Sequence, residues 1–455
     1  MSWLTLFELA DMCGGSLRGI TDEQAGALNI NRVERDSRQV SNGDLFLAIK
    51  GESFDAHDFV PQVAGRAGAA LVENYVEADI PQVVVNDVRY AMGRLGSAWR
   101  NCFANPVIAL TGSNGKTTLK EMITAILSGS GNAHATRGNL NNDLGVPLTL
   151  YELRPGQHDY AVIEMGANHF GEIDYLAGLV RPDVAVLNNA GAAHLEGFGS
   201  VTGVARAKGE IFSGLSDGAV AIINADDDYF EYWRELNTQR RVISFGMDSA
   251  EADVKGVSGS NGLLLMGFEE QSVEVSLPLL GRHNAMNALA AAAAVLPLGI
   301  KLGAVKAGLE KLQPVKGRLC PLRGSGGELI IDDTYNANPT SALAAVQVLA
   351  QQNGRTLLVL GDMGELGVDG MDMHAEIGRQ AACLGIDALY GAGEMSVAAC
   401  DAFGAGAVAC ADMNELLQSL QTLQLNENNS VLVKGSRSAR MERVVDALMN
   451  QEVTA

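Results

Sequence analysis

One stretch constrains this chain more than any other: residues 111–118, which read TGSNGKTT. The apolar run 107–110 before it predicts a buried strand, and the apolar residues after it are spaced for one face of a helix. A glycine-rich loop in this context binds phosphate, because its backbone N–H groups turn inward and the helix N-terminus carries partial positive charge. Lys116 then reaches the terminal phosphates, and the Thr117 hydroxyl is placed to hold Mg²⁺. Residues 111–118 are called the phosphate loop below.

The phosphate loop departs from the general G-x-x-x-x-G-K-[ST] pattern, since Ala109 stands where that pattern has its first glycine. The flanking strand and helix nevertheless favour a nucleotide site over a glycine-rich turn with an exposed lysine. The candidate nucleotide-binding residues of the loop are Gly112, Ser113, Asn114, Gly115, Lys116, Thr117 and Thr118.

Length and composition predict a three-domain α/β protein. A chain of 455 residues is too long for one core and suggests about three domains at ~150 residues each. Changes in the residue pattern predict domains at 1–84, 85–314 and 315–455. We expect a small α/β domain, then a phosphate-loop domain with a mostly parallel sheet, then a Rossmann-like α/β domain.

Charge and cysteine usage limit the partners and the compartment. The formal net charge of -21 argues against nucleic acid or an anionic membrane surface as the main partner. The six cysteines are scattered without a C-x-x-C pair, which is typical of reduced thiols. The longest small apolar run, 288–296, is too short to span a bilayer, and the first residues lack a basic signal-peptide region. We therefore expect a soluble cytoplasmic protein.

Two polar residues lie at the ends of predicted strands in the central part of the chain. Glu164 ends the strand 160–163, and His194 comes shortly after the strand 184–187. Ligands bind at the carboxyl ends of parallel strands, so both side chains should face the same crevice as Lys116. Glu164 suits a hard cation, and a neutral His194 suits a second cation or its water. Their shared placement favours this interpretation over a salt-bridge partner and a solvated loop histidine.

Lys208 lies in a predicted helix, 204–212, whose apolar residues mark a packed face. Helix phase places Lys208 beside Val204 and Ile211, near that face. A lysine there costs free energy unless its charge is accommodated. Periodicity alone favours an apolar stem with the ammonium group in water.

Further candidates lie beyond residue 280. Asn284 is placed to cap an alanine-rich helix, and Asn287, one turn on, either reads a purine edge or caps the helix. A predicted strand that ends near residue 331 lacks the G-x-G-x-x-G fingerprint and is followed by Asp333, which suits a ribose hydroxyl or a metal. Arg318, just upstream, suits a phosphate.

Longer strings carry a resemblance to a known family. With a loop of the form T-G-[ST]-x-G-K-[ST], which explains Ala109, the chain resembles the Mur ligase family along all three predicted domains. One small departure is Ala56, where the family's D-G-H-x-F motif has glycine. The strings are DSR from Asp36, GNLNNDLGVPLTL from Gly138, EMGANHFGEI from Glu164, NNAGAAHLEGFGS from Asn188, DDTYNANPTS from Asp332 and KGSRSARMERVV from Lys434.

The resemblance implies an ATP-dependent amide ligase of peptidoglycan precursor synthesis, and hence a link to cell shape and division. The strings are similar to those of the branch that joins D-alanyl-D-alanine to UDP-N-acetylmuramoyl-tripeptide. ATP would phosphorylate the terminal carboxylate of the tripeptide, and the dipeptide amine would attack the acyl phosphate. We expect a monomer with these two substrates, ATP and two Mg²⁺ ions as ligands.

The resemblance also implies roles for the central residues. Lys116 would stabilise the transferring phosphoryl group, and Thr117 and Glu164 would hold one Mg²⁺. His194 and a carbamylated Lys208 would serve the second Mg²⁺. A carbamate turns a misplaced cation into an oxygen donor, which reverses the preference for a solvated Lys208 ammonium.

The remaining roles concern ATP and the two substrates. Asn287 would meet adenine, Arg318 the phosphates and Asp333 the ribose. Because these ATP residues lie on two predicted domains, we expect a hinge that closes over the nucleotide. The expected substrate residues are Ser37 and Arg38 for the UDP-sugar, Asn139 and Asn142 within the second string, and Asn336 and Asn338 for the dipeptide.

Two alternatives stay open at this point. A related Mur ligase or a folylpolyglutamate-type ligase would share the ATP site and differ in its substrate loops. A phosphate-loop switch protein would bind nucleotide without forming a bond. The switch is disfavoured because it has no need for Glu164, His194 and Lys208 around a second metal.

Overall fold

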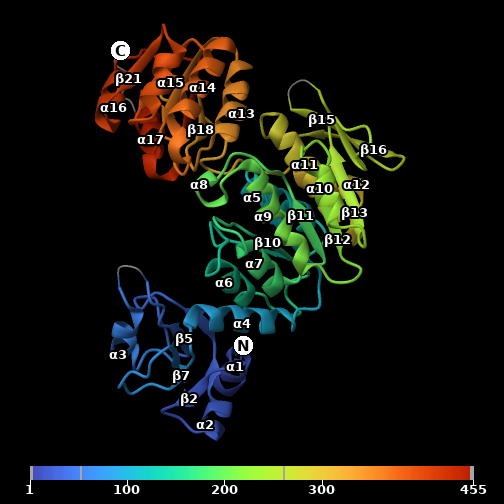
Figure 1. Cartoon of the computed structure of the whole chain (residues 1–455), viewed down its shortest axis with the longest axis vertical. Helices are drawn as coiled ribbons and strands as arrows, with labels where there is room; N and C mark the ends of the chain where they lie inside the picture. Colours follow the sequence, from blue (N-terminus) through green and yellow to red (C-terminus); the bar gives the residue numbers. More distant parts are fainter. Residues whose placement is uncertain (1–3, 52–53, 260–261, 451–455) are drawn as a thin grey trace.

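The computed structural model describes residues 4–51, 54–259 and 262–450, and it shows three α/β units that follow one another along an elongated molecule (Figure 1). Each unit is built on its own sheet, apart from the small pair β1–β3. The expected α/β class is therefore confirmed.

The first unit contains a five-stranded sheet in the order β2-β7-β6-β5-β4, parallel except for β2. Ala56 begins a short 3₁₀ segment and does not adopt a positive φ, so alanine fits the turn where the family motif has glycine. The elements are β1 (Leu4–Thr5), α1 (Leu6–Cys13), β2 (Ser16–Arg18), α2 (Asp22–Ala27), β3 (Asn29–Ile30), β4 (Arg32–Glu34), β5 (Asp44–Leu47), α3 (Val60–Val63), β6 (Ala69–Val72) and β7 (Gln82–Val84).

The central unit contains a nine-stranded sheet in the order β16-β15-β14-β13-β12-β11-β8-β10-β9. The ladders from β9 to β14 are parallel, and only β15 and β16 run antiparallel to their neighbours. Its elements are α4 (Val88–Arg100), β8 (Val107–Thr111), α5 (Lys116–Leu127), β9 (Ala133–Ala135), α6 (Gly145–Tyr151), β10 (Tyr160–Glu164), α7 (Glu172–Val180), β11 (Val184–Leu187), α8 (Leu195–Phe198), α9 (Val201–Gly209), β12 (Val220–Asn224), α10 (Phe230–Glu235), β13 (Arg241–Gly246), β14 (Val254–Ser258), β15 (Leu263–Phe268), β16 (Gln271–Ser276), α11 (Arg282–Val295) and α12 (Leu302–Leu309).

Helices cover both faces of the central sheet. All five residues of β8 are buried, as expected of a strand with helices on both sides. One core cluster joins this sheet to α5, α11 and α12, and another joins it to α6, α7 and α9. The alanine-rich α11 lies against α5, because small side chains let the two helices approach closely. The phosphate loop is thereby held between buried elements.

The third unit has a six-stranded sheet in the order β17-β18-β22-β19-β20-β21, parallel except for β17. The strand expected to end near residue 331 is β18, which lies beside β22, and β22 in turn lies beside β19. The elements are β17 (Cys320–Arg323), β18 (Leu329–Asp333), α13 (Pro339–Ala350), β19 (Arg355–Gly361), α14 (Gly370–Cys383), β20 (Ala388–Ala392), α15 (Ser396–Phe403), β21 (Ala407–Cys410), α16 (Met413–Gln421), β22 (Asn429–Lys434) and α17 (Glu442–Met449).

Helix α4 joins the first unit to the central unit. It packs on α1 on one side and on α6 and α7 on the other, and a single core cluster runs through all of them. The Trp99 indole N–H donates to the Leu153 carbonyl at 3.0 Å, which fixes the end of α4 to the loop after α6. The first unit is thus fastened to the central unit by a shared core.

No helix among the described residues is long and apolar enough to cross a membrane. All six cysteines are free thiols, in agreement with the expectation of reduced cysteines.

Trp233 is the largest fully buried side chain that supports α9, the helix that carries Lys208. Its indole N–H donates to the Ala205 carbonyl at 3.0 Å. We expect Trp233→Ala to lower the free energy of unfolding of the central unit by about 3–5 kcal/mol, because it leaves a large cavity. Trp233→Phe, which keeps most of the volume, should cost about 1 kcal/mol for the lost hydrogen bond. Urea unfolding followed by circular dichroism would measure both, and equal losses would contradict a cavity as the main cause.

Candidate active site

A cavity of about 980 Å³ lies where the carboxyl ends of β8, β10 and β11 meet loops of the third unit. Most of the residues predicted for the site line it, which confirms that the strand ends face one crevice. Of the predicted set, Gly112, Lys208, Ser37 and Arg38 are not among the lining residues. The predicted residues that line the cavity are Ser113 to Thr118, Asn139, Asn142, Glu164, His194, Asn287, Arg318, Asp333, Asn336 and Asn338.

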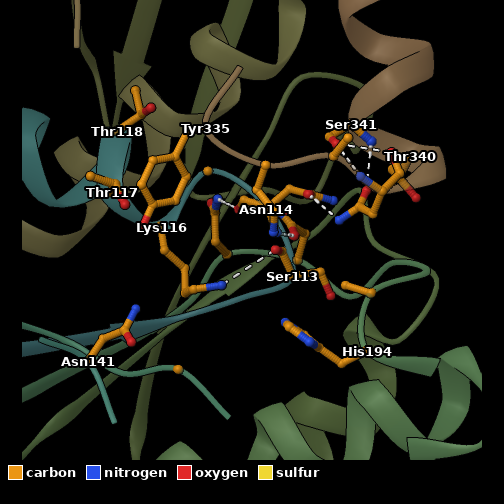
Figure 2. A pocket seen from close by; sticks show the side chains of 18 of the residues that line it. Ser113, Asn114, Lys116, Thr117, Thr118, Asn141, His194, Tyr335, Thr340 and Ser341 are labelled. Carbon is orange, nitrogen blue, oxygen red and sulfur yellow. Dashed lines mark hydrogen bonds between the residues drawn. The ribbon is translucent and has the colours of Figure 1, made fainter. Parts of the chain in front are cut away.

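The phosphate loop adopts the conformation that its glycines allow. Gly115 has φ 79° and precedes the first residue of α5. The Lys116 ammonium turns back over the loop and donates to the Gly112 carbonyl at 2.6 Å. It also lies 3.4 Å from the Ser113 carbonyl (Figure 2). Burial lowers the pKa of Lys116, and the negative charge of Glu164 opposes this effect. A phosphate would therefore meet a preplaced Lys116 side chain at the N-terminus of α5.

The segment after β11 fixes the phosphate loop. The Gly191 N–H donates to the Ser113 hydroxyl at 2.9 Å, and the Asn114 N–H donates to the Asn189 side-chain oxygen at 2.9 Å. The Asn188 amide donates to the Asn114 carbonyl at 3.0 Å. Asn188 and Asn189 were not predicted as site residues, although both open one of the strings of the family resemblance and directly follow a predicted strand.

Asn287 supports the loop from α11. It is buried, and its side-chain oxygen accepts from the Asn188 amide at 2.8 Å. A Cβ atom on Gly115 would lie 2.5 Å from that same oxygen, so only glycine fits there. Capping by Asn284 or Asn287 was a wrong expectation, because α11 already begins at Arg282 and the Asn284 amide donates to the Leu280 carbonyl instead. Contact of Asn287 with a purine stays a prediction.

Glu164 is the last residue of β10, and its side chain is buried, with 2% exposed. One oxygen accepts from the Asn141 amide at 2.8 Å and lies 3.5 Å from the Thr117 hydroxyl. The other oxygen is buried and has no hydrogen-bond partner among the described residues. The Arg318 guanidinium donates to the Thr117 hydroxyl at 3.0 Å. A buried carboxylate oxygen without a partner, beside a hydroxyl, fits a hard cation.

His194 directly precedes α8 and has φ 53°, a positive value that is uncommon outside glycine. Its Nδ1 lies against the carboxylate of Glu365, a residue of the third unit, but that nitrogen has no hydrogen-bond partner among the described residues. Burial lowers the pKa of His194, and Lys116 and Lys208 act in the same direction against the effect of Glu365. No signal in the sequence pointed to Glu365.

Lys208 is buried, with 1% of it exposed, so the expectation of an ammonium group in water was wrong. It donates to the Ala167 carbonyl at 3.3 Å, and its Nζ lies 5.4 Å from the centre of the Phe198 ring. Burial, assisted by the charge of Lys116, lowers the pKa of Lys208 to about 7. An amine with this pKa is substantially neutral and nucleophilic at physiological pH.

The third unit contacts the phosphate loop through a few side chains. Arg318 lies over the Tyr335 ring, with its guanidinium carbon 4.2 Å from the ring centre. Asn338 caps α13, and its amide donates to the side-chain oxygen of Asn114 at 2.8 Å. Figure 2 shows Asn114 directed toward Thr340 and Ser341 in the first turn of α13. Asn338 thus contacts the phosphate loop, and its contact with a dipeptide stays a prediction.

Asp333, Asn336, Asn142 and Arg38, which were also predicted, have structural partners as well. The Asp333 carboxylate pairs with the buried Lys434 ammonium, which also donates to the Asn336 carbonyl at 3.0 Å. The Asn142 side-chain oxygen accepts from Gly145, the first residue of α6, at 2.9 Å. Arg38, in the first unit, pairs with Asp36 and is largely exposed. Lys434 was not predicted as a site residue, although it opens the last string of the resemblance.

Comparison with known proteins assigns the family. Family models match three successive parts of the chain: "Mur ligase family, catalytic domain" at 29–100, "Mur ligase middle domain" at 110–295, and "Mur ligase, glutamate ligase domain" at 317–437. The chain is 47% identical to the UDP-N-acetylmuramoyl-tripeptide--D-alanyl-D-alanine ligase of Escherichia coli over 98% of both chains.

Solved structures agree with the sequence match. A MurF crystal structure from Acinetobacter baumannii superimposes with a TM-score of 0.91 at 42% identity, covering 98% of both chains. A MurF ligase from Thermotoga maritima in complex with ADP has a TM-score of 0.83 at 28% identity and covers 92% of this chain and 97% of its own.

Gly115 offers a test of the phosphate loop. We expect Gly115→Ala to weaken ADP binding by about tenfold or more, since the new methyl group collides with Asn287 at a backbone conformation that alanine resists. Gly218→Ala is the matched control, because Gly218 has φ 86°, lies outside the cavity lining and has nothing within 4 Å of the place a methyl group would take. Titration calorimetry measures both variants. Equal affinities for the two would mean that the contact with Asn287 is unimportant.

Proposed function

Because the chain belongs to the Mur ligase family, we infer that it is an ATP-dependent ligase that joins D-alanyl-D-alanine to UDP-N-acetylmuramoyl-tripeptide. The observation that carries this conclusion is similarity to a ligase named for that activity over almost the whole chain, together with a MurF crystal structure that superimposes over 98% of both chains. The reaction contributes to the synthesis of peptidoglycan precursors.

The reaction has two chemical steps. The terminal carboxylate of the tripeptide attacks the γ-phosphorus of ATP, which forms an acyl phosphate and releases ADP. The dipeptide amine then attacks the acyl carbon, and the tetrahedral intermediate loses phosphate and a proton to leave the amide. Lys116 and Arg318 supply positive charge where the phosphoryl group is transferred, and the phosphate loop orients it. Positioning and charge neutralisation thus account for most of the work.

Mg²⁺ fits beside Glu164 and Thr117, where the buried carboxylate oxygen lacks a partner. Among the described residues no three His, Cys, Asp or Glu side chains gather into a metal cluster. This agrees with Mg²⁺, which takes few protein ligands and binds phosphate oxygens and water as well. When bound, the ion would neutralise charge on the phosphates. His194 and Lys208 are the proposed residues for a second ion.

A carbamate on Lys208 is the finer proposal for this lysine. Its neutral amine can attack CO₂, which forms an N–C bond and releases a proton to give an oxygen-bearing anion. The buried position and the lowered pKa of Lys208 support this reaction, because deprotonation of its ammonium group costs little free energy near neutral pH.

The domain bounds and substrate contacts remain proposals. We place the domains at 1–84, 85–314 and 315–455, in line with the three sheets. Ser37 and Arg38 are proposed for the UDP-sugar, Asn139 and Asn142 for the tripeptide, and Asn336 for the dipeptide. Asn287 is proposed to contact the adenine of ATP, and Asp333 its ribose. A cytoplasmic monomer that serves cell shape and division is the expected context.

Phosphate release tests the substrate assignment. With ATP and UDP-N-acetylmuramoyl-tripeptide, we expect release to depend on D-alanyl-D-alanine, and glutamate or diaminopimelate should not replace it. Release with one of those amino acids would favour a related ligase. Nucleotide binding without any product would favour a switch protein.

Lys208→Ala tests the carbamate. We expect the variant to lose ligation and to regain part of it with added bicarbonate or short carboxylates, which supply the missing oxygens. Full activity without additives would contradict the proposal.

The modification itself should depend on pH. Burial lowers the pKa of Lys208 to about 7, so the reactive neutral amine is present above that pH and is lost as the pH falls through it. Carbon-13 NMR with labelled bicarbonate should show a carbamate signal that grows from pH 6 to 8 by about tenfold, following amine deprotonation. Lys208→Ala serves as the blank, and a signal that persists in it would assign the carbamate to another lysine.

A further inference from the structure

One amide side chain joins the third unit to the phosphate loop, and both of its ends have partners. The side-chain oxygen of Asn338 accepts from the Ser341 N–H at 2.9 Å, which caps α13. A backbone N–H only donates, so this bond determines which end of the amide is the oxygen. The NH₂ group therefore faces the central unit, where it donates to the side-chain oxygen of Asn114 at 2.8 Å. A helix cap is thus also a contact between two units.

The backbone of Asn338 is fixed as well. Its N–H donates to the Ser341 hydroxyl at 3.1 Å, which completes a capping box. Pro339 follows it and restricts Asn338 to extended backbone, as observed at φ -139° and ψ 167°. Because the side chain leaves a fixed backbone and is held at its oxygen, the contact with Asn114 costs little further conformational entropy.

Asn338 ends a segment that lines the cavity. Residues 333–338, called the cavity wall below, connect β18 to α13, and Asp333, Asn336 and Asn338 line the cavity. The buried Lys434 ties the cavity wall to its own unit, because it pairs with Asp333 and donates to the Asn336 carbonyl. Asn338 ties the other end of the wall to Asn114 of the phosphate loop. The spacing between the wall and the loop therefore depends on a hydrogen bond between two units.

Helix α13 touches the central unit near both of its ends. A Cβ atom on Gly191 would lie 3.1 Å from the Thr340 hydroxyl oxygen, so the first turn lies close to the segment 188–191. Near the far end, a Cβ atom on Gly281 would lie 2.7 Å from Cγ2 of Val348. The apolar contact at Val348 favours the docked arrangement in water, whereas water competes for a hydrogen bond between neutral amides. The contact at the phosphate loop is therefore the one that opens more readily.

We propose that Asn338 is a positioning residue: while it caps α13, its hydrogen bond to Asn114 sets the position of the cavity wall over the phosphate loop. This role replaces the predicted contact of Asn338 with the dipeptide, because both ends of the amide already have partners. That the nucleotide lies between the wall and the loop rests on the proposed function. A nucleotide that touches both sides binds more weakly when this hydrogen bond is lost, since part of its binding free energy is then spent on bringing the two units together.

Three variants separate the hydrogen bond to Asn114 from the helix cap. Serine and aspartate both cap helices, but serine is too short to reach Asn114, and an aspartate carboxylate does not donate. Asn338→Ser and Asn338→Asp therefore keep the cap and lose the contact with the loop, whereas Asn338→Ala loses both.

Two measurements on the full chain should group these variants differently. Titration calorimetry with Mg²⁺ and ADP should show affinity lowered by about fivefold in Asn338→Ser and Asn338→Ala, the effect of one hydrogen bond. Asn338→Asp should lose more, because its charge also repels the phosphates. Thermal unfolding should show Tm lowered by about 2–4 °C in Asn338→Ala alone, since only that variant lacks a cap.

Asp412→Ala is the matched control for loss of a cap. Asp412 caps α16, none of whose residues lines the cavity. This control should lower Tm as Asn338→Ala does and leave the ADP affinity unchanged.

A double-mutant cycle tests whether Asn338 acts through Asn114. Asn114→Ala removes the acceptor of the hydrogen bond, so adding Asn338→Ser to it should lower the ADP affinity little further. Fully additive effects of the two substitutions would overturn the proposal.

Wild-type ADP affinity in Asn338→Ser and Asn338→Asp would also overturn it, as would an affinity that falls only in Asn338→Ala, where loss of the cap explains the result. Unchanged ADP affinity with a raised KM for D-alanyl-D-alanine would restore the dipeptide contact instead. A wild-type protein that binds ADP as expected but forms no amide would contradict the proposed function alone. If the wild type binds no ADP, small-angle X-ray scattering decides: Asn338→Ser should have the larger radius of gyration, and an equal value would overturn the proposal.

Discussion

The geometry of the site depends on the hydrogen bonds between the phosphate loop and the segment 188–191. Each bond contributes only about 1 kcal/mol to stability. Together they hold Ser113 and Asn114 in place from the side of the segment 188–191. Asn287 occupies the space beside Gly115. Without this support a glycine-rich loop would sample many conformations, and Lys116 would lose its position. The third unit then docks on the same fixed loop through Asn338 and Arg318.

Positive charge is concentrated locally in a chain that is strongly acidic overall. The chain carries a formal net charge of -21, yet Lys116 and Arg318 face one cavity and Lys208 lies close enough to Lys116 for their charges to interact. Mutual repulsion and burial both disfavour the charged form of Lys208. The same arrangement that attracts phosphates therefore keeps an amine neutral, so that phosphate binding and amine reactivity arise from one electrostatic source.

The sequence predicted the local features of the fold and site, and missed the features that join distant parts of the chain. Apolar runs located β8, β10 and β11, and the rule for parallel strand ends placed Glu164 and His194 in the crevice. The contact of Asn188 with Asn287 spans 99 residues, and that of Asp333 with Lys434 spans 101. Neither pair has a periodicity or spacing that indicates it, since the packing of helices and strands that are distant along the chain creates it. The exposure of Lys208 was predicted wrongly from periodicity. A helical wheel shows on which face of the helix a side chain lies, but it does not show how deeply that face is buried.

Helix α4 has a consequence for how substrates are chosen. Because it shares one core with the first unit and with the central unit, the distance between their two sheets is set by packed side chains and resists change. If the first unit binds the UDP-sugar as proposed, the substrate must extend its reactive carboxylate across that fixed distance to the phosphate loop. Substrate selection would then depend on the length of the peptide. A peptide one residue too short or too long would place its carboxylate away from the γ-phosphate, even if its ends were well bound. Discrimination by size would thus reside in the rigid helix between the two binding regions.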